Sequence, residues 1–160
     1  MIPTIATLIG LVLALPIVFM LGMRFKWPFV LDAVRAMNKR LMNPRQMRSA
    51  GTPGAYAAVI HHVGRSSGRP YTTPVGVLRT GDEILITLPY GTRPDWLKNV
   101  LAAGTTSIDH EGDHIEVEHP EVVATVEVID RFPESDRRTQ QLFAVDQVLR
   151  LRAVTGADRR

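Results

Sequence analysis

Residues 60–75 read IHHVGRSSGRPYTTPV and form the stretch that decides the predicted fold. The β-branched and aromatic residues on either side of its centre predict two strands, over 55–63 and 71–79. The segment 64–70 between them is rich in Gly and Ser, which is typical of a turn. A short turn makes the two strands antiparallel neighbours, so this stretch predicts a β-rich domain.

The sequence on the C-terminal side continues this pattern of short strands and turns. Gly-Asp pairs at 81–82 and 112–113 lie between apolar runs and indicate hairpin turns. A helix is predicted where Pro94 and Asp95 suit a first turn and Gly104 suits the position past the end. About six strands with few helices predict a small antiparallel barrel. The other predicted strands cover 83–89, 105–111, 114–118 and 122–129; the helices cover 94–103 and 135–146; and 148–154 fits either a last strand or a continuation of the second helix.

The composition excludes several kinds of chemistry. The chain has 160 residues, which predicts one globular domain, and it contains no cysteine. Disulfides, thiolate nucleophiles, cysteine-bound zinc and iron–sulfur clusters are therefore excluded. The net charge of +3 comes from one short region, because residues 24–48 hold seven Lys or Arg against one Asp.

The N-terminal stretch predicts a membrane anchor. Residues 2–23 carry no charged side chain, and a helix of that length is about 33 Å long, enough to cross a bilayer core. No Lys or Arg precedes the run, whereas Arg24, Lys26 and Trp27 follow it, which favours a retained anchor over a signal peptide or a buried core helix. The position of these basic residues predicts a single-pass protein of the cell membrane whose C-terminal domain is cytoplasmic.

We therefore predict three regions along the chain. Residues 1–27 form the membrane anchor, 28–54 a basic amphipathic helix with a linker, and 55–160 the barrel domain. The helix suits anionic lipid headgroups, and it equally suits packing on the barrel with its charges solvated, so both interpretations stay open. Its basic patch has no base-stacking aromatic residues, so nucleic-acid binding is not expected.

The turn of the first hairpin holds the best candidate for an anion site. Glycines let backbone N–H groups converge on an anion, and serine hydroxyls add donors. Arginine side chains offer planar groups that match phosphate or carboxylate oxygens. The turn is neither a Walker A loop nor a dinucleotide-binding fingerprint, and a solvated hairpin is the alternative interpretation. The candidate residues are Arg65, Ser66, Ser67, Gly68 and Arg69.

Other polar residues give weaker signals. His110, His114 and His119 are close in sequence, but His114 and His119 fall on opposite faces of one predicted strand, so no metal site is predicted. Hydrolysis by a Ser-His-Asp triad has no nucleophile elbow to support it. Trp96 and Asn99 share one helix face, where they either line a site or anchor the helix and satisfy a loop.

Three motifs, taken together, resemble a known family. The stretch 60–75, the pair Tyr90-Gly91 and the helix DWLKNVLAAG at 95–104 resemble the deazaflavin-dependent nitroreductase family of actinobacterial oxidoreductases in order and separation. The resemblance covers residues 43–155. It implies a split β-barrel of the flavin-reductase, FMN-binding type and the deazaflavin coenzyme F-420. It also implies an oxidoreductase that passes a hydride from the reduced coenzyme to a quinone or an activated nitro compound.

The resemblance further implies roles for individual residues. The turn with Arg65 and Arg69 would hold the coenzyme tail, which bears phosphate and carboxylate groups. Tyr90 is the predicted catalytic residue, because its hydroxyl could polarise a substrate oxygen. Trp96 and Asn99 would buttress the pocket. The residues expected along the deazaflavin ring are Thr73, Pro74, Val75, Gly76, Pro89, Tyr90 and Gly91.

Departures from the family pattern guide the predicted substrate. Family nitroreductases carry a small hydroxyl residue at the position of Pro89 and tyrosines in the C-terminal helical region, whereas this chain has no Tyr after Tyr90. Together with the predicted anchor, this favours a lipophilic acceptor, a quinone rather than a nitro compound. The alternatives are FMN in place of F-420, and a non-catalytic barrel that binds a lipid, haem or flavin at the membrane. A homodimer is left open.

Overall fold

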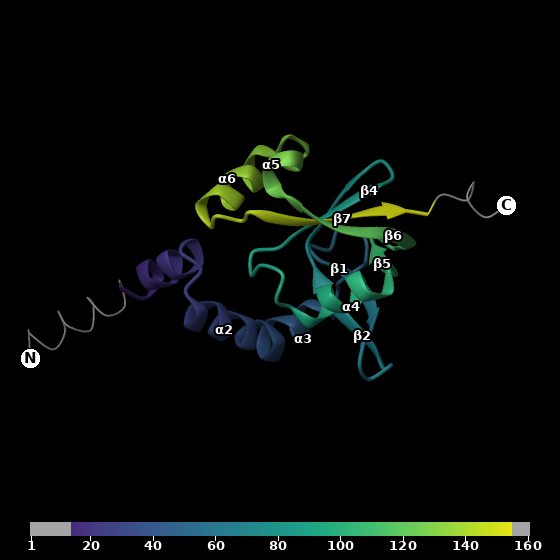
Figure 1. The fold of residues 1–160 in the computed structure, drawn as a ribbon, viewed down its shortest axis with the longest axis horizontal. Helices are drawn as coiled ribbons and strands as arrows, with labels where there is room; N and C mark the ends of the chain where they lie inside the picture. Colours follow the sequence, from purple (N-terminus) through teal and green to yellow (C-terminus); the bar gives the residue numbers. More distant parts are fainter. Residues whose placement is uncertain (1–13, 155–160) are drawn as a thin grey trace, which may run out of the picture.

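The computed structural model describes residues 14–154, and its centre is a sheet of seven antiparallel strands (Figure 1). The order of the strands in the sheet is β2-β1-β5-β6-β7-β4-β3. The predicted mainly β fold with flanking helices is therefore confirmed. The strands are β1 (Ala58–Val63), β2 (Pro70–Val75), β3 (Val77–Thr80), β4 (Glu83–Thr87), β5 (Thr105–His110), β6 (Asp113–Ala124) and β7 (Gln147–Ala153).

The sheet curls into a half-barrel because its two edge strands follow each other in the chain. β2 and β3 lie at opposite edges of the sheet, yet only Gly76 separates them. One extended residue spans at most about 3.6 Å, so the two edges must approach each other at this point. The single strand predicted over 71–79 is wrong, because β2 pairs with β1 whereas β3 pairs with β4.

β6 is one long strand where the sequence predicted two, over 114–118 and 122–129. Its first half pairs with β5 and its second half with β7, with a register shift between Glu118 and Glu121. His119 has a positive φ of 53° at this bulge, which interrupts the alternating pattern. The strand stops where the Glu127 carboxylate accepts the Ala124 N–H at 3.1 Å, so residues 125–128 form the short helix α5 (Thr125–Val128).

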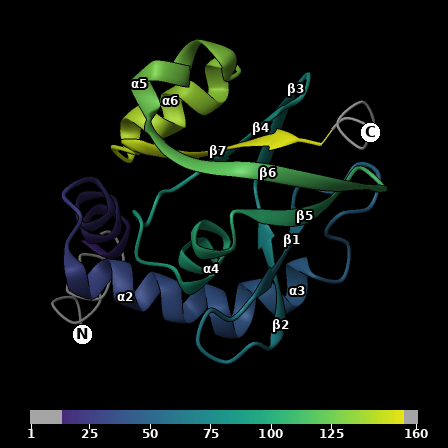
Figure 2. The same ribbon diagram turned by 45° about the vertical axis from the view of Figure 1, so that its right-hand side comes forward.

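Apolar side chains fill both faces of the central strands. One face of the sheet packs on α4 (Asp95–Ala103). The other face packs against Val128 of α5 and against Phe132, which lies between η2 (Ile129–Arg131) and α6 (Glu134–Leu142). Figures 1 and 2 show α5 and α6 above the sheet and α2 below it. The helix predicted over 94–103 is confirmed, and the helix predicted over 135–146 is present but ends at Leu142. Of the two alternatives for 148–154, the structure has the strand. The first cluster includes Ile60, Ile86, Leu97, Val100, Ile108, Leu149 and Leu151, and the second comprises Leu85, Val123, Val128, Phe132 and Val148.

A bent helical arm precedes the sheet. The helix Ala14–Arg24 is followed by a short turn and by α2 (Pro28–Met37), which continues through the π-helix η1 (Asn38–Met42) into α3 (Asn43–Gln46). α2 buries Val30, Leu31 and Val34 in a cluster that includes Tyr90 and Phe143. The arm therefore packs on the domain, in agreement with the packing interpretation of this basic helix.

Within residues 14–154, no single helix is both long and apolar enough to cross a membrane. Ala14–Arg24 and Pro28–Gln46 meet the length and composition criteria only as a pair, and they are bent by 106° relative to each other. Much of the predicted anchor, residues 1–13, lies outside the described part of the chain. The anchor and the three predicted regions thus stay predictions.

Candidate active site

A cleft of about 1100 Å³ lies between the helical arm and the sheet. Its walls are the end of the arm, the β1–β2 hairpin and the turn between β4 and α4. The site residues predicted from the sequence line it, except Gly68 and Arg69. Those on the lining are Arg65, Ser66, Ser67, Thr73, Pro74, Val75, Gly76, Pro89, Tyr90, Gly91, Trp96 and Asn99.

A chain of hydrogen bonds holds one end of the cleft. Asn99 on α4 is only 5% exposed, and its Oδ1 accepts the backbone N–H of Arg65 at 3.2 Å and the Arg65 guanidinium at 2.9 Å. The same guanidinium lies 3.3 Å from the Asp95 carboxylate. On its other side, Asn99 Nδ2 donates to His62 Nδ1 at 3.0 Å. The buried amide therefore fixes Arg65 and His62 at the polar end of the cleft.

His62 is held in its uncharged form within this series of hydrogen bonds. Because Nδ1 accepts from Asn99, the ring proton lies on Nε2, which is 3.1 Å from Thr73 Oγ1. The ring stacks on Tyr71 with 5.7 Å between centroids. Burial lowers the pKa of His62, against a smaller opposing effect of the Asp95 charge. His62 is thus neutral at neutral pH and acts as a hydrogen-bonding link.

The β1–β2 turn does not form the predicted concavity of free backbone N–H groups. The Gly64 carbonyl accepts from the N–H of Ser67 at 3.2 Å and of Gly68 at 2.8 Å, and the Gly64 N–H donates to the Arg69 carbonyl at 2.8 Å. The tight turn uses these groups to close itself. Gly68 and Arg69 lie outside the cleft lining, so the predicted anion-binding groups that face the cleft are the Arg65 side chain and the hydroxyls of Ser66 and Ser67.

Two glycines of the cleft lining, Gly76 and Gly91, border open space. The Gly91 N–H donates to the Leu88 carbonyl at 2.9 Å with φ at 69°, a conformation that suits glycine. A Cβ built on Gly76 or Gly91 would meet no atom within 4 Å, so both positions border open space. Val75 belongs to the main core cluster and Trp96 packs against it, so core packing fixes the position of this wall.

Tyr90 connects the cleft to the helical arm. Its ring packs in the cluster of Val30, Leu31 and Val34, and its hydroxyl accepts a hydrogen bond from Asn38 Nδ2 at 2.6 Å. Burial raises the pKa of Tyr90, against a smaller lowering by that hydrogen bond. Tyr90 is therefore protonated at neutral pH, and its hydroxyl hydrogen can serve as a donor.

The sequence reasoning missed the wall that the arm contributes. Arg35, Asn38, Lys39 and Asn43 all line the cleft. Pro44 lacks an N–H, so the helix cannot continue its regular bonding there, and the Asn43 N–H instead donates to the Asn38 carbonyl five residues back. A proline in a helical pattern was the only sequence signal for this π-helical segment.

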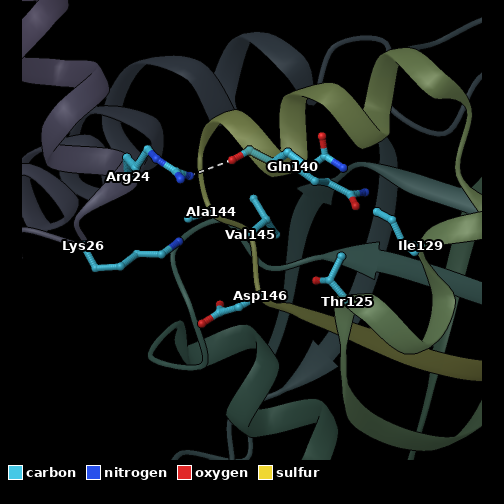
Figure 3. A pocket seen from close by; sticks show the side chains of 9 residues that line it. Arg24, Lys26, Thr125, Ile129, Gln140, Ala144, Val145 and Asp146 are labelled. Carbon is cyan, nitrogen blue, oxygen red and sulfur yellow. Dashed lines mark hydrogen bonds between the residues drawn. The ribbon is translucent and has the colours of Figure 1, made fainter.

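A second, smaller cavity of about 340 Å³ lies where the arm meets the α6 side of the sheet (Figure 3). Arg24 Nη1 donates to the Gln141 carbonyl at 2.8 Å, and Lys26 Nζ lies 3.3 Å from both the Pro89 and Phe143 carbonyls. Burial lowers the pKa of Lys26, with an opposing effect of the nearby Asp146 charge. The Lys26 contact ties the arm to the turn beside Tyr90. The cavity is lined by Arg24, Lys26, Thr125, Ile129, Gln140, Gln141, Ala144, Val145 and Asp146.

A family model described as F-420H(2)-dependent quinone reductase matches residues 34–142. The match begins in α2 and ends in α6, so it includes every wall of the cleft. The chain belongs to this family. It is a deazaflavin-dependent oxidoreductase whose cofactor is F-420, as the resemblance in its sequence implied.

Solved structures resemble the chain only distantly. An F-420 reductase is 16% identical, with 68% of this chain and 92% of that chain covered and a TM-score of 0.40. An F-420-H2-dependent reductase is 14% identical, with 60% and 93% covered and a TM-score of 0.42. An FMN-binding protein from Syntrophomonas wolfei is 14% identical, with 78% and 93% covered and a TM-score of 0.40. A search of curated proteins gave no significant match.

Proposed function

We propose that the protein transfers a hydride from reduced F-420 to a lipophilic quinone at a membrane surface. The observation that carries this proposal is the position of Tyr90. Tyr90 lines the cleft, its hydroxyl is bonded to Asn38, which also lines the cleft, and its ring packs on the buried face of the helical arm. The group suited to polarise an acceptor therefore lies beside the element predicted to meet the lipid.

The cleft fits the coenzyme in size and in the chemistry of its walls. A volume of about 1100 Å³ is large enough for a cofactor of this class. Arg65, Ser66 and Ser67 would hold the acidic tail, and Gly76 and Gly91 leave room for the planar ring. The bound coenzyme supplies the hydride, so the protein needs no nucleophile and has to bind and orient both partners.

Tyr90 has the geometry of a hydrogen-bond donor to the acceptor. Asn38 holds the hydroxyl oxygen at 2.6 Å, which leaves the hydroxyl hydrogen to point at an acceptor carbonyl. Reduction of a quinone to a hydroquinone adds one hydride and one proton. Negative charge develops on the acceptor oxygen as the hydride arrives, and a positioned O–H stabilises it until a solvent proton is taken up.

The membrane part of the proposal draws on apolar side chains that the domain leaves uncovered. Leu15 and Phe25 are 64% exposed and Phe29 is 63% exposed, all on the arm. Exposed apolar groups on the same arm as the basic residues Arg24 and Lys39 suit an anionic lipid surface. An acceptor dissolved in lipid could then reach Tyr90 along the arm. The single-pass anchor, its cytoplasmic orientation, the split-barrel type and a homodimer belong to this proposal.

The test is oxidation of reduced F-420 by the full-length protein in vesicles. We expect a menaquinone analogue to be reduced clearly faster than a nitroimidazole. The return of coenzyme fluorescence measures the rate. Faster reduction of the nitro compound would contradict the quinone assignment. Tight coenzyme binding without turnover of quinone, nitro or enone compounds would favour the non-catalytic binding module instead.

A further inference from the structure

Three ligating side chains gather on the sheet face that points away from the cleft. His62 lines the cleft, and because side chains alternate along a strand, His61 on β1 points the opposite way. Asp109 on β5 pairs with His114 on β6, and the β1–β5 register sets Asp109 diagonally beside His61, since Val59 is its direct partner. Three adjacent strands thus bring these residues to one place.

The side chains of this cluster point toward one another. His61 Nε2 lies 2.7 Å from Asp109 Oδ2, and His114 Nδ1 lies 2.5 Å from Asp109 Oδ1. One ligand atom of each residue lies within 4.8 Å of those of the other two. Both imidazoles therefore present a ring nitrogen to the same small volume beside a carboxylate.

We propose that His61, Asp109 and His114 bind one divalent transition-metal ion. Two imidazole nitrogens and one carboxylate oxygen suit Zn²⁺, Co²⁺, Ni²⁺ or Cu²⁺ and are a poor set for Mg²⁺ or Ca²⁺. Metal–ligand bonds of about 2.0–2.2 Å place tetrahedral ligand atoms about 3.4 Å apart, so small side-chain rotations convert the present contacts into coordination.

The surroundings of the cluster suit an exchangeable site. The three side chains are 38%, 36% and 56% exposed, in chain order, so an ion can enter from solvent and water can complete its coordination. The Glu116 carboxylate lies 3.3 Å from His114 Nε2, the nitrogen that does not face the cluster. A carboxylate on the far nitrogen orients a metal-binding imidazole and raises its basicity.

The backbone that carries the ligands is held in place. Gly51 donates its N–H to the Ala57 carbonyl at 2.8 Å and accepts the Gly112 N–H at 2.7 Å, which closes the β5–β6 hairpin against the chain before β1. A Cβ on Gly51 would lie 2.9 Å from that of Asp109, so this contact is too close for any larger residue. Ligands on strands fixed in this way need little reorganisation to bind an ion.

The alternative is a set of metal-free hydrogen bonds, in which Asp109 accepts from both histidines. Full-length protein with its purification tag removed would be stripped with a chelator and titrated with Zn²⁺ by calorimetry and with Co²⁺ by visible absorption. We expect one ion per chain and Co²⁺ bands typical of nitrogen and oxygen ligands. Each of H61A, D109N and H114A should weaken binding at least about 10-fold, since even loss of an outer partner costs about 10- to 100-fold.

Matched controls come from the same strands. H110A and H119A remove histidines from β5 and β6 that lie outside the cluster, and both should leave Zn²⁺ binding unchanged. The unfolding midpoint without metal checks the fold of each variant, and H61Q replaces H61A if the latter is destabilised. Absence of Zn²⁺ binding by the wild type, or its loss in the controls but not in the cluster variants, would overturn the proposal. The result is independent of F-420, because the cluster faces away from the cleft.

Discussion

The polar end of the cleft and the Tyr90 end differ in which elements hold them. At the polar end, Arg65, Asn99 and His62 are linked by hydrogen bonds between the β1–β2 hairpin and α4, all within the folded domain. At the other end, Tyr90 depends on Asn38, which belongs to the helical arm. One end is thus part of the sheet domain, and the other is completed by a separate element that packs on it.

This difference separates binding from turnover. The polar end presents fixed donors whether or not the arm is in place, which suits recognition of a charged coenzyme tail. The Tyr90 end is completed by Asn38 of the arm, and the Lys26 contact with the Pro89 carbonyl helps to hold the arm on the domain. We therefore expect changes at the polar end to alter coenzyme affinity and changes at the Tyr90 end to alter turnover.

The largest effect is expected from Y90F. Removing one preorganised donor to a developing negative charge lowers kcat about 100-fold or more, whereas the ring still fills the cluster with Val30 and Val34. Steady-state reduction of a menaquinone analogue measures kcat, and fluorescence titration measures the coenzyme Kd, which should stay unchanged.

Y71F is the matched control for this prediction. The Tyr71 hydroxyl lies at the polar end, 3.5 Å from Ser67 Oγ, and should have no part in turnover. An unchanged kcat in Y90F would make Tyr90 a packing residue and remove the proposed donor. An equal loss in both variants would abolish the distinction between the two ends.

The next largest effect is expected from R65A. Loss of a charge-assisted contact costs about 1.5–3 kcal/mol, so the Kd for F-420 should rise about 10- to 100-fold with little change in kcat. The sequence predicted the same loss for R69A, but Arg69 lies outside the cleft lining, and this variant now serves as the control. Equal weakening in both would place the coenzyme tail around the turn rather than inside the cleft.

The arm itself is tested by its exposed phenylalanines. In a protein shortened by residues 1–13, so that no full-length span holds it in the bilayer, the double variant F25S/F29S removes two side chains that are nearly two-thirds exposed, and we expect about 10-fold weaker sedimentation with anionic vesicles. V126S is the control, because Val126 on α5 is 79% exposed but lies away from the arm. Deletion of residues 1–27 should release the protein to the soluble fraction, and a soluble wild-type protein would contradict the membrane proposal.

Local patterns in the sequence predicted most elements of the fold but not their neighbours. The helix over 94–103 was predictable because capping residues act within a few positions, whereas the alternation over 148–154 left strand and helix open until the pairing of β7 with β4 and β6 was known. The break at Gly76 was not, since it arises from the pairing of β2 and β3 with strands at opposite edges. The bulge at His119 likewise serves the change of partner along β6.

The candidate site divides in the same way. Arg65, Trp96 and Asn99 were predictable because they belong to motifs with a family resemblance. Asn38 was not, because its contact with Tyr90 joins residues 52 positions apart. The pairing of His61 with Asp109 was likewise not predictable from closely spaced histidines, because the two residues lie on different strands and 48 positions apart.

The smallest predicted effect is the pH dependence of stability that His62 gives to the polar end. Burial lowers the pKa of His62, so the unfolded chain binds a proton there more readily than the folded chain. The resulting stability is complete above the ordinary histidine pKa of about 6.5 and is lost as the pH falls below it, through the lowered value of the folded state. A proton on Nδ1 would also face the Asn99 amide donor and break the link to Arg65.

Urea unfolding at a series of pH values should therefore show a decline in acid that H62Q removes and that H119Q, outside the network, retains. Parallel curves for the wild type and H62Q would mean that His62 is not held neutral, and the polar end would then be no more preorganised than the Tyr90 end.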